Sequence, residues 1–289
     1  MGAKPQRDQW AEWIAERRHG GDPELLRQEL EGLAPVRDKV IANAHVAAGH
    51  TVLDVGCGAG LIGFAAAEAV GTTGTVIFSD ISADLLERCR ELAAQRGLLD
   101  QCRFVRTPAS DLSGIGDEAV DAVTLRSVLI YEADKAAAFA EFYRVLRPHG
   151  RVSLFEPINR FSNLFDGYDF GPVAELAAKV GEVYEAIQPA DSDPMRNFDE
   201  RDLVSFTERA GFEELHLELT IDVRPSPPRP WTAVVNVAAN PRVPTLGEAM
   251  RQVLTAEEAD RMSAHLQPLV EQGHGTRRLA VCYLSARRL

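Results

Sequence analysis

Residues 51–60 read TVLDVGCGAG, an apolar run that ends in three glycines at alternate positions, Gly56, Gly58 and Gly60. The apolar run predicts a buried strand, and the alanine-rich segment 61–70 predicts a helix directly after the glycines. Glycine lets the backbone turn tightly and approach a ligand closely, and the start of a helix adds unpaired N–H groups. We therefore expect a ligand-binding loop at this strand–helix junction.

The same alternation of strand and helix continues along the chain. Further patterns predict strands at 75–79, 103–106, 120–125 and 151–155, and helices at 82–96, with Ser82 as the N-cap, and at 134–146. Strands that alternate with helices in this way indicate βαβ units and a parallel sheet covered on both faces. The predicted fold class is α/β, a Rossmann-like doubly wound sheet. Its ligand crevice lies at the carboxyl ends of the strands.

The remaining segments are less regular. Helices are predicted over 8–46 with a break at 20–23, over 173–187, over 199–210 with Asp199 as the N-cap, and over 245–271; strands are predicted at 215–221 and 278–285, with an extended proline-rich segment at 224–230. We expect four parts: an N-terminal helical lid segment (1–46), the binding core (47–156), a lid insertion (157–198), and the rest of the core sheet (199–289) with a helical insertion at about 222–276. Lid segments of this extent favour an enclosed small-molecule site.

The spacing of the glycines distinguishes between the classes of ligand that such a loop can bind. A dinucleotide fingerprint that starts at Gly56 needs glycine at position 61, where this chain has Leu61, so a nicotinamide oxidoreductase is disfavoured. The P-loop is excluded because no Gly-Lys-Ser/Thr follows the glycines. The carboxylate of Asp54 beside the loop disfavours a pyrophosphate and favours a ligand that carries a cation.

A second acid follows the next predicted strand. Asp80 lies 20 residues beyond Gly60, where a carboxylate can accept hydrogen bonds from both hydroxyls of a ribose. Ile81 is placed to pack on an adenine face. A nucleoside with a positive, amino-acid-like group fits both acids, and S-adenosylmethionine (SAM) has this chemistry.

Residues 51–156 resemble the class I SAM-dependent methyltransferases. The resemblance rests on LDVGCGAG (53–60), the acid of FSDIS (78–82), DAVTLRSVLIY (121–131) and RVLRPHGRVSLFEP (144–157). It implies a seven-stranded sheet whose last strand is antiparallel, with helical lid or cap insertions, and it implies SAM as the cofactor.

The resemblance also implies roles for individual residues. Gly56, Gly58 and Gly60 would line the methionine part of SAM, Asp54 would orient their loop, and Asp80 would hold the ribose. The residues implied near the adenine are Ile81, Ala109, Ser110 and Asp111. Arg126 and Ser127 would face the methionine end and the substrate. The Asn-Pro-Pro-Tyr motif of nucleobase methyltransferases is absent after the fourth predicted strand, where Arg126-Ser-Val stands.

The sequence assigns no catalytic group, and four residues are candidates only: Tyr131, Glu156, Asn159 and Arg126. The predicted reaction is methyl transfer from SAM to an oxygen, nitrogen or carbon atom of a small organic acceptor, for example a specialised metabolite. The alternative is a non-catalytic SAM-binding regulatory or partner subunit.

The composition of the chain further limits the classes of partner that it can bind. The chain has 289 residues, with 31 Lys and Arg against 43 Asp and Glu, for a net charge of -12. This balance argues against nucleic acid and against anionic membrane surfaces as partners. No secretory signal is visible, and the four cysteines form no metal-binding spacing, so free thiols, no metal and a cytoplasmic location are expected. The oligomeric state stays open.

Overall fold

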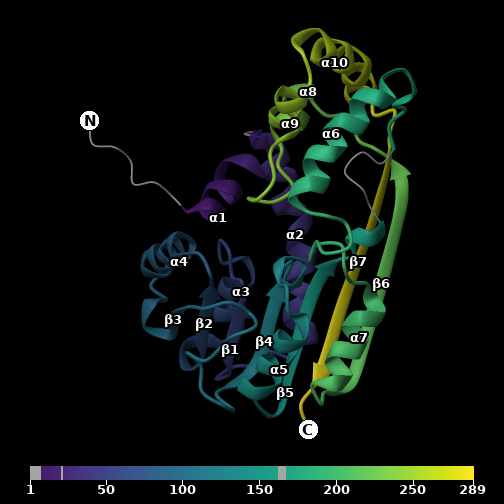
Figure 1. The fold of residues 1–289 in the computed structure, drawn as a ribbon. Coiled ribbons are helices and arrows are strands. Elements are labelled where there is room, and N and C mark those ends of the chain that lie inside the picture. Colours follow the sequence, from purple (N-terminus) through teal and green to yellow (C-terminus); the bar gives the residue numbers. More distant parts are fainter. Residues whose placement is uncertain (1–7, 21, 162–166) are drawn as a thin grey trace. The chain divides into compact units, whose positions relative to one another are not determined.

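The computed structural model describes residues 8–20, 22–161 and 167–289 (Figure 1). The chain divides into two compact units, and each is described by itself. The sheet unit is made of residues 32–158, 198–220 and 281–289, and the helical unit of residues 1–31, 159–197 and 221–280. Helix α2 and strands β6 and β7 each continue from one unit into the other.

Within the described residues, seven strands form one sheet in the order β3-β2-β1-β4-β5-β7-β6. The strands are β1 (Thr51–Val55), β2 (Thr75–Asp80), β3 (Cys102–Arg106), β4 (Val120–Arg126), β5 (Leu146–Pro157), β6 (Glu213–Pro225) and β7 (Thr276–Arg287). Strands β1 to β5 pair in parallel, and β7 pairs antiparallel with β5. This order places the carboxyl ends of β2, β1, β4 and β5 side by side. The predicted Rossmann-like sheet with an antiparallel last strand is confirmed.

Helices cover the sheet and form the second unit. The α-helices are α1 (Gln9–Glu12), α2 (Pro23–Asn43), α3 (Leu61–Val70), α4 (Ala83–Gln95), α5 (Lys135–Val145), α6 (Ala174–Ile187), α7 (Glu200–Arg209), α8 (Trp231–Asn236), α9 (Leu246–Val253) and α10 (Ala256–Glu271). Shorter turns are η1 (Trp13–Arg17), η2 (Gly71–Thr73), η3 (Leu99–Gln101), η4 (Leu129–Tyr131), η5 (Asn159–Phe161) and η6 (Gly171–Val173).

Side chains at the helix starts explain where several helices begin. The hydroxyl of Ser82 accepts a hydrogen bond from the N–H of Leu85, and the carboxylate of Asp199 accepts bonds from the first turn of α7. Both residues are the predicted N-caps. The segment predicted to be helical over 245–271 forms two helices, α9 and α10, because Thr255 starts a new one. The hydroxyl of Thr255 accepts from the N–H of Glu258 and starts α10 as a new helix.

The core of the sheet unit is apolar on both faces of the strands. Phe78 in β2 is fully buried and lies between the rings of Phe64 and Phe104, at centroid distances of 5.2 and 5.3 Å. Gly63 in α3 allows this packing, since a Cβ there would lie 2.2 Å from the Phe78 ring. Close contact of α3 with β2 fixes the start of α3 beside the end of β1, where the glycine loop lies.

The helical unit has its own apolar core. Residues from α6, α8, α9 and α10 form it, and Figure 1 shows these four helices gathered together. The N-terminal segment joins this unit through the indole N–H of Trp13, which donates to the carbonyl of Ala238 at 2.8 Å. Arg17 adds an ion pair with Glu248 at 2.6 Å. No helix in the described ranges is both long and apolar enough to cross a membrane.

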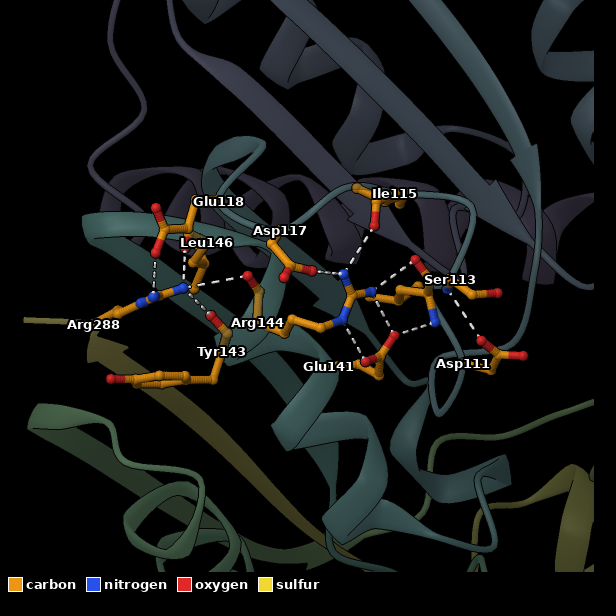
Figure 2. Close-up of polar contacts among 11 residues, drawn as sticks. Asp111, Ser113, Ile115, Asp117, Glu118, Glu141, Tyr143, Arg144, Leu146 and Arg288 are labelled. Atoms are coloured by element: carbon orange, nitrogen blue, oxygen red, sulfur yellow. Dashed lines mark hydrogen bonds and ion pairs between the residues drawn. The ribbon is translucent and has the colours of Figure 1, made fainter.

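Arg288 stabilises the end of α5, and we expect Arg288→Met to destabilise the fold. Its guanidinium donates to the carbonyls of Tyr143, Arg144 and Leu146 at 2.6–3.2 Å and to Glu118 at 2.6 Å (Figure 2). Carbonyls at a helix end have no partner in the helix, and the substitution removes the guanidinium donors from all three carbonyls, although that of Arg144 also accepts from the N–H of Glu118. Urea unfolding should show a loss of about 2–4 kcal/mol.

The control for this prediction is Arg88→Met, which removes an exposed guanidinium from α4. That variant should unfold at the same urea concentration as the wild-type protein. Equal stability of the Arg288→Met and Arg88→Met variants contradicts the role of Arg288.

Candidate active site

The loop after β1 turns through its three glycines. Gly56, Gly58 and Gly60 have φ angles of 60°, 53° and 83°, the left-handed region that favours glycine. A Cβ at Gly56 would lie 2.5 Å from a methyl group of Val128, so only glycine fits this close approach to the turn after β4. The loop is therefore shaped by its sequence before any ligand binds.

Asp54 anchors this loop from inside the sheet. Its carboxylate accepts a hydrogen bond from the N–H of Gly63 at 2.8 Å and one from the hydroxyl of Thr124 at 3.2 Å. Burial raises the pKa of Asp54 to about 7, although these two bonds and the charge of Arg126 act in the opposite direction. Burial thus outweighs the hydrogen bonds and the charge of Arg126 that favour the ionised form of Asp54.

The raised pKa predicts that Asp54→Asn becomes more stable relative to the wild-type protein as the pH rises. A carboxyl whose pKa is higher in the folded than in the unfolded chain binds more protons when folded, so its contribution to stability falls between the two pKa values. This loss of stability occurs between the ordinary Asp pKa of 3.8 and the pKa of about 7 in the folded chain. Asn keeps an acceptor for Gly63 and does not ionise.

Urea unfolding at several pH values from 4 to 8 measures this effect. The stability difference between variant and wild type should change by about 4 kcal/mol between these two pKa values, since one pKa unit corresponds to about 1.4 kcal/mol. Asp100→Asn, at an exposed carboxylate, is the matched control. A difference that is constant with pH contradicts the prediction.

Asp80 connects the end of β2 to the glycine loop. One carboxylate oxygen accepts from the N–H of Gly58 and the other from the N–H of Ser82, both at 2.9 Å. The carboxylate is held in a fixed orientation at the carboxyl edge of the sheet. The adjacent side chain of Ile81 is 41% exposed, which leaves an apolar surface beside the acid.

The loop after β3 carries Asp111, and side chains of α5 hold this loop in place. The carboxylate of Asp111 accepts from the N–H of Ser113 at 3.1 Å. Arg144 donates to the carbonyl of Ile115 and pairs with Glu141, as Figure 2 shows. It also donates to the carbonyl of Leu112 at 2.9 Å. Ala109 is buried, Ser110 is half-buried and Asp111 is exposed. The loop backbone is thus held while the Asp111 side chain faces solvent.

The turn after β4 is held by a buried carboxylate from β5. The N–H groups of Val128, Leu129 and Ile130 donate to Glu156 at 2.8, 3.0 and 3.3 Å. Ser127, which precedes them, has a φ of 54° and donates its N–H to the carbonyl of Phe155 at 2.9 Å. Because three backbone N–H groups donate to this one carboxylate, the backbone that follows Arg126 is fixed.

Burial raises the pKa of Glu156 to about 7, while its three backbone hydrogen bonds and the charge of Arg126 lower it. Its carboxylate oxygens are directed at backbone N–H groups of η4. Tyr131 ends η4 and is half-buried. Asn159 begins η5 and belongs to the helical unit. The catalytic roles considered for these three residues and for Arg126 stay predictions.

The sheet order brings most of the predicted cofactor residues to one edge. The acids Asp54 and Asp80, the glycine loop and the Arg126-Ser127 pair all follow neighbouring strands. Sequence reasoning missed that Thr124 supports Asp54. The available signal was a hydroxyl residue inside an otherwise apolar strand. Sequence reasoning also missed the Arg144–Glu141 pair, which no local pattern connects to the loop that it holds.

These residues fit SAM on chemical grounds. The buried carboxyl of Asp54, whose pKa burial raises to about 7, would gain charge compensation from a ligand cation. Asp80 offers a fixed carboxylate to ribose hydroxyls, and the exposed Ile81 offers an apolar face to a base.

Comparison with known proteins decides the family. A methyltransferase domain family matches residues 52–150. The ubiquinone/menaquinone biosynthesis C-methyltransferase UbiE of Klebsiella pneumoniae subsp. pneumoniae is 33% identical over 174 residues, which cover 58% of this chain and 68% of that protein. The chain belongs to the class I SAM-dependent methyltransferases. The methyltransferase activity and the SAM cofactor predicted from the sequence are confirmed.

Solved structures share the fold of this methyltransferase at low sequence identity. A candidate methyltransferase from Bacillus halodurans C-125 is 22% identical, with a TM-score of 0.53 over 87% of this chain and 98% of that one. Phosphoethanolamine N-methyltransferase 2 of Haemonchus contortus, solved with S-adenosyl-L-methionine, is 14% identical, with a TM-score of 0.52 over 88% of this chain and 52% of that one.

Proposed function

We propose that this methyltransferase transfers the methyl group to a carbon atom of a small organic acceptor whose reacting carbon lies next to an ionised oxygen, as in a phenolate or enolate. The observation that carries the proposal is the similarity to a ubiquinone/menaquinone biosynthesis C-methyltransferase over 174 residues at 33% identity. The competing possibility, which the sequence left open, is transfer of the methyl group to oxygen or nitrogen.

The acids at the site support carbon as the acceptor atom. Transfer to a hydroxyl oxygen is helped by a general base that takes the proton. Asp54, Asp80 and Glu156 each direct their carboxylates at backbone N–H groups of the fold. These three acids therefore have structural tasks in the fold. A phenolate or enolate carbon is already nucleophilic, so no base is needed at the moment of transfer. The demethylated cofactor is the leaving group, and the proton of the methylated carbon leaves to solvent afterwards.

The residues of the chain would act by placement and charge. SAM, when bound, supplies a methyl group on a positively charged sulfur, which a nucleophile can accept directly. Gly56, Gly58 and Gly60 would hold the methionine part and Asp80 the ribose. Arg126, at the end of β4, would stabilise the ionised oxygen of the acceptor by its charge. Holding the reactants in line can contribute ~7–11 kcal/mol to lowering the barrier.

The walls of the acceptor site are not assigned to particular side chains. The lid role predicted for the segments 1–46, 157–198 and 222–276 stays a prediction. Within the helical unit, the segments 157–198 and 222–276 share one apolar core that includes Trp231, Met250 and Met262. A folded unit with its own core is what a lid requires.

Activity on a panel of acceptors tests the proposal. The protein is incubated with SAM carrying an isotope-labelled methyl group and with phenols, quinols, β-dicarbonyl compounds, amines and carboxylates. We expect labelled product from the phenolic or enolic compounds, with the methyl resonance of a carbon-bound group. Labelled O-methyl or N-methyl product, with no C-methyl product from any compound, contradicts carbon as the acceptor atom. Calorimetry with SAM confirms beforehand that the preparation binds its cofactor.

A further inference from the structure

The sheet unit contains a cavity at the edge opposite the glycine loop. Its volume is about 290 Å³, and its lining residues are Ala44, His45, His50, Asp121, His149, Arg151 and Arg287. His50 precedes β1, whereas the glycine loop follows β1. A strand of five residues spans about 17 Å. The cavity is therefore separate from the methyl-transfer site.

Two arginines face each other across strands at this cavity. Arg151 in β5 and Arg287 in β7 are direct register partners in the antiparallel pair. Like charges in this position are unfavourable unless an anion lies between them. Glu214 supplies one such anion, accepting from Arg151 at 2.8 Å and from Arg287 at 2.9 Å. Each guanidinium has five N–H donors, and Glu214 uses one from each.

The histidines add further donors. His50 accepts at Nδ1 from the N–H of Ala47 at 3.3 Å, so its Nε2 carries the proton. His149 has its Nδ1 at 3.1 Å from a guanidinium nitrogen of Arg287. Because guanidinium only donates, this Nδ1 accepts and the Nε2 of His149 carries the proton. Both imidazoles therefore retain an N–H that can donate to a ligand.

The acid in the lining is already neutralised by its neighbours. One oxygen of Asp121 accepts from the N–H of Thr51 at 2.7 Å and from Arg147 at 2.6 Å. A metal does not suit the cavity, since no group of three or more His, Cys, Asp or Glu in the described part of the chain could hold an ion. In a protein of net charge -12, the concentration of arginine and histidine here favours an anion.

Backbone strain gathers at the same place. His45, His149 and Glu214 have φ angles of 50°, 70° and 48°. They are three of the five non-glycine residues with positive φ among those the structure describes. Such conformations cost of order 1–3 kcal/mol each and cluster at ligand sites. His45 follows the end of α2, and His149 and Glu214 lie near the starts of β5 and β6.

We propose that this cavity binds a small oxyanion of the phosphate class, either inorganic phosphate or a phosphate monoester. Arg151 and Arg287 donate to its oxygens from the two facing strands, and His50 and His149 donate from the adjacent loops. The guanidinium pair suits phosphate because its planar donors can contact two oxygens at once.

Calorimetric titration of the full chain with inorganic phosphate tests the proposal, at fixed ionic strength and with chloride, acetate and glycerol phosphate as the other ligands. We expect saturable binding of phosphate, glycerol phosphate or both, and no saturable binding of chloride or acetate. Arg287→Gln should raise the phosphate Kd about tenfold or more, as expected for loss of a hydrogen bond to a charged group. Tighter binding of glycerol phosphate than of inorganic phosphate would identify a monoester as the ligand.

A second variant and a control guard against misfolding and non-specific charge effects. His149→Asn keeps a residue type that tolerates positive φ but removes the imidazole donor, and it should weaken phosphate binding several-fold. Arg88→Gln removes an exposed arginine of α4 and should leave phosphate binding unchanged. Nuclear magnetic resonance of the seven histidine rings should show phosphate-dependent shifts for His45, His50 and His149.

Three results overturn the proposal. One is the absence of saturable phosphate and glycerol phosphate binding. Another is a Kd in Arg287→Gln and His149→Asn equal to that of the wild-type protein. The third is an equal loss of binding in Arg88→Gln, because this would indicate charge screening and no defined site.

Discussion

Asp80→Asn is expected to raise the Kd of SAM about 100-fold or more. Two hydrogen bonds from ribose hydroxyls to a carboxylate are each worth about 1.5–3 kcal/mol, and the amide offers a single weaker acceptor. The substitution also affects the glycine loop, since the carboxylate of Asp80 accepts the N–H of Gly58 at 2.9 Å. Calorimetry with SAM and with its demethylated product measures the change. Both ligands should weaken alike, because they share the ribose.

The control is Asp100→Asn, which neutralises an exposed acid of the same unit and leaves the net charge equal to that of Asp80→Asn. It should bind SAM as the wild-type protein does. Thermal unfolding without ligand shows whether each variant is folded. A folded Asp80→Asn protein with unchanged SAM affinity refutes the ribose role of Asp80.

Glu156→Gln is expected to lower kcat/KM about 100-fold and to reduce stability. The carboxylate accepts three N–H groups of the turn after β4, and an amide has only one acceptor oxygen and turns an NH₂ group toward the remaining donors. Loss of these bonds should cost about 2–4 kcal/mol in urea unfolding. The turn would then shift, and a displacement of about 1 Å at a reacting group can cost about 100-fold in rate.

The pH profile separates this positioning role from a loss of fold. Burial raises the pKa of Glu156 to about 7, and only the ionised form accepts from all three donors. Activity of the wild-type enzyme should therefore rise as the pH increases through about 7, and the Glu156→Gln variant should lack this rise. Glu208→Gln, at an exposed glutamate of α7, is the control and should keep the wild-type profile. A Glu156→Gln protein with wild-type rate and profile contradicts the role.

Local patterns predicted the elements well where their signals lie close together in sequence. Ser82 and Asp199 cap helices as expected because a cap depends on only three or four neighbouring residues. The same kind of local signal was overlooked at Thr255, whose capping box divides the predicted 245–271 helix. The short helix α8 was missed because the prolines before Trp231 obscured its start.

The sequence named candidate residues for the site but not the residues that hold them in place. Asp54, the three glycines and Asp80 follow a motif that fits within two strands and their loops. The support from Glu156 requires β5 to lie beside the turn after β4, which only the tertiary fold provides. The basic cavity likewise joins His45, His149 and Arg287, whose separation in the chain conceals any common pattern.

The assembly of the helical unit from three separate stretches has a consequence for synthesis on the ribosome. The indole of Trp13 bonds to a carbonyl 225 residues further along the chain. At ~5–20 residues per second, the ribosome needs about 10–45 s to bridge that gap. During this time residues 32–158, which contain β1 to β5, have already emerged. The parallel strands can thus begin to pair before Ala238 is synthesised, so nascent chains of this enzyme should expose the indole of Trp13 until Ala238 has emerged from the ribosome.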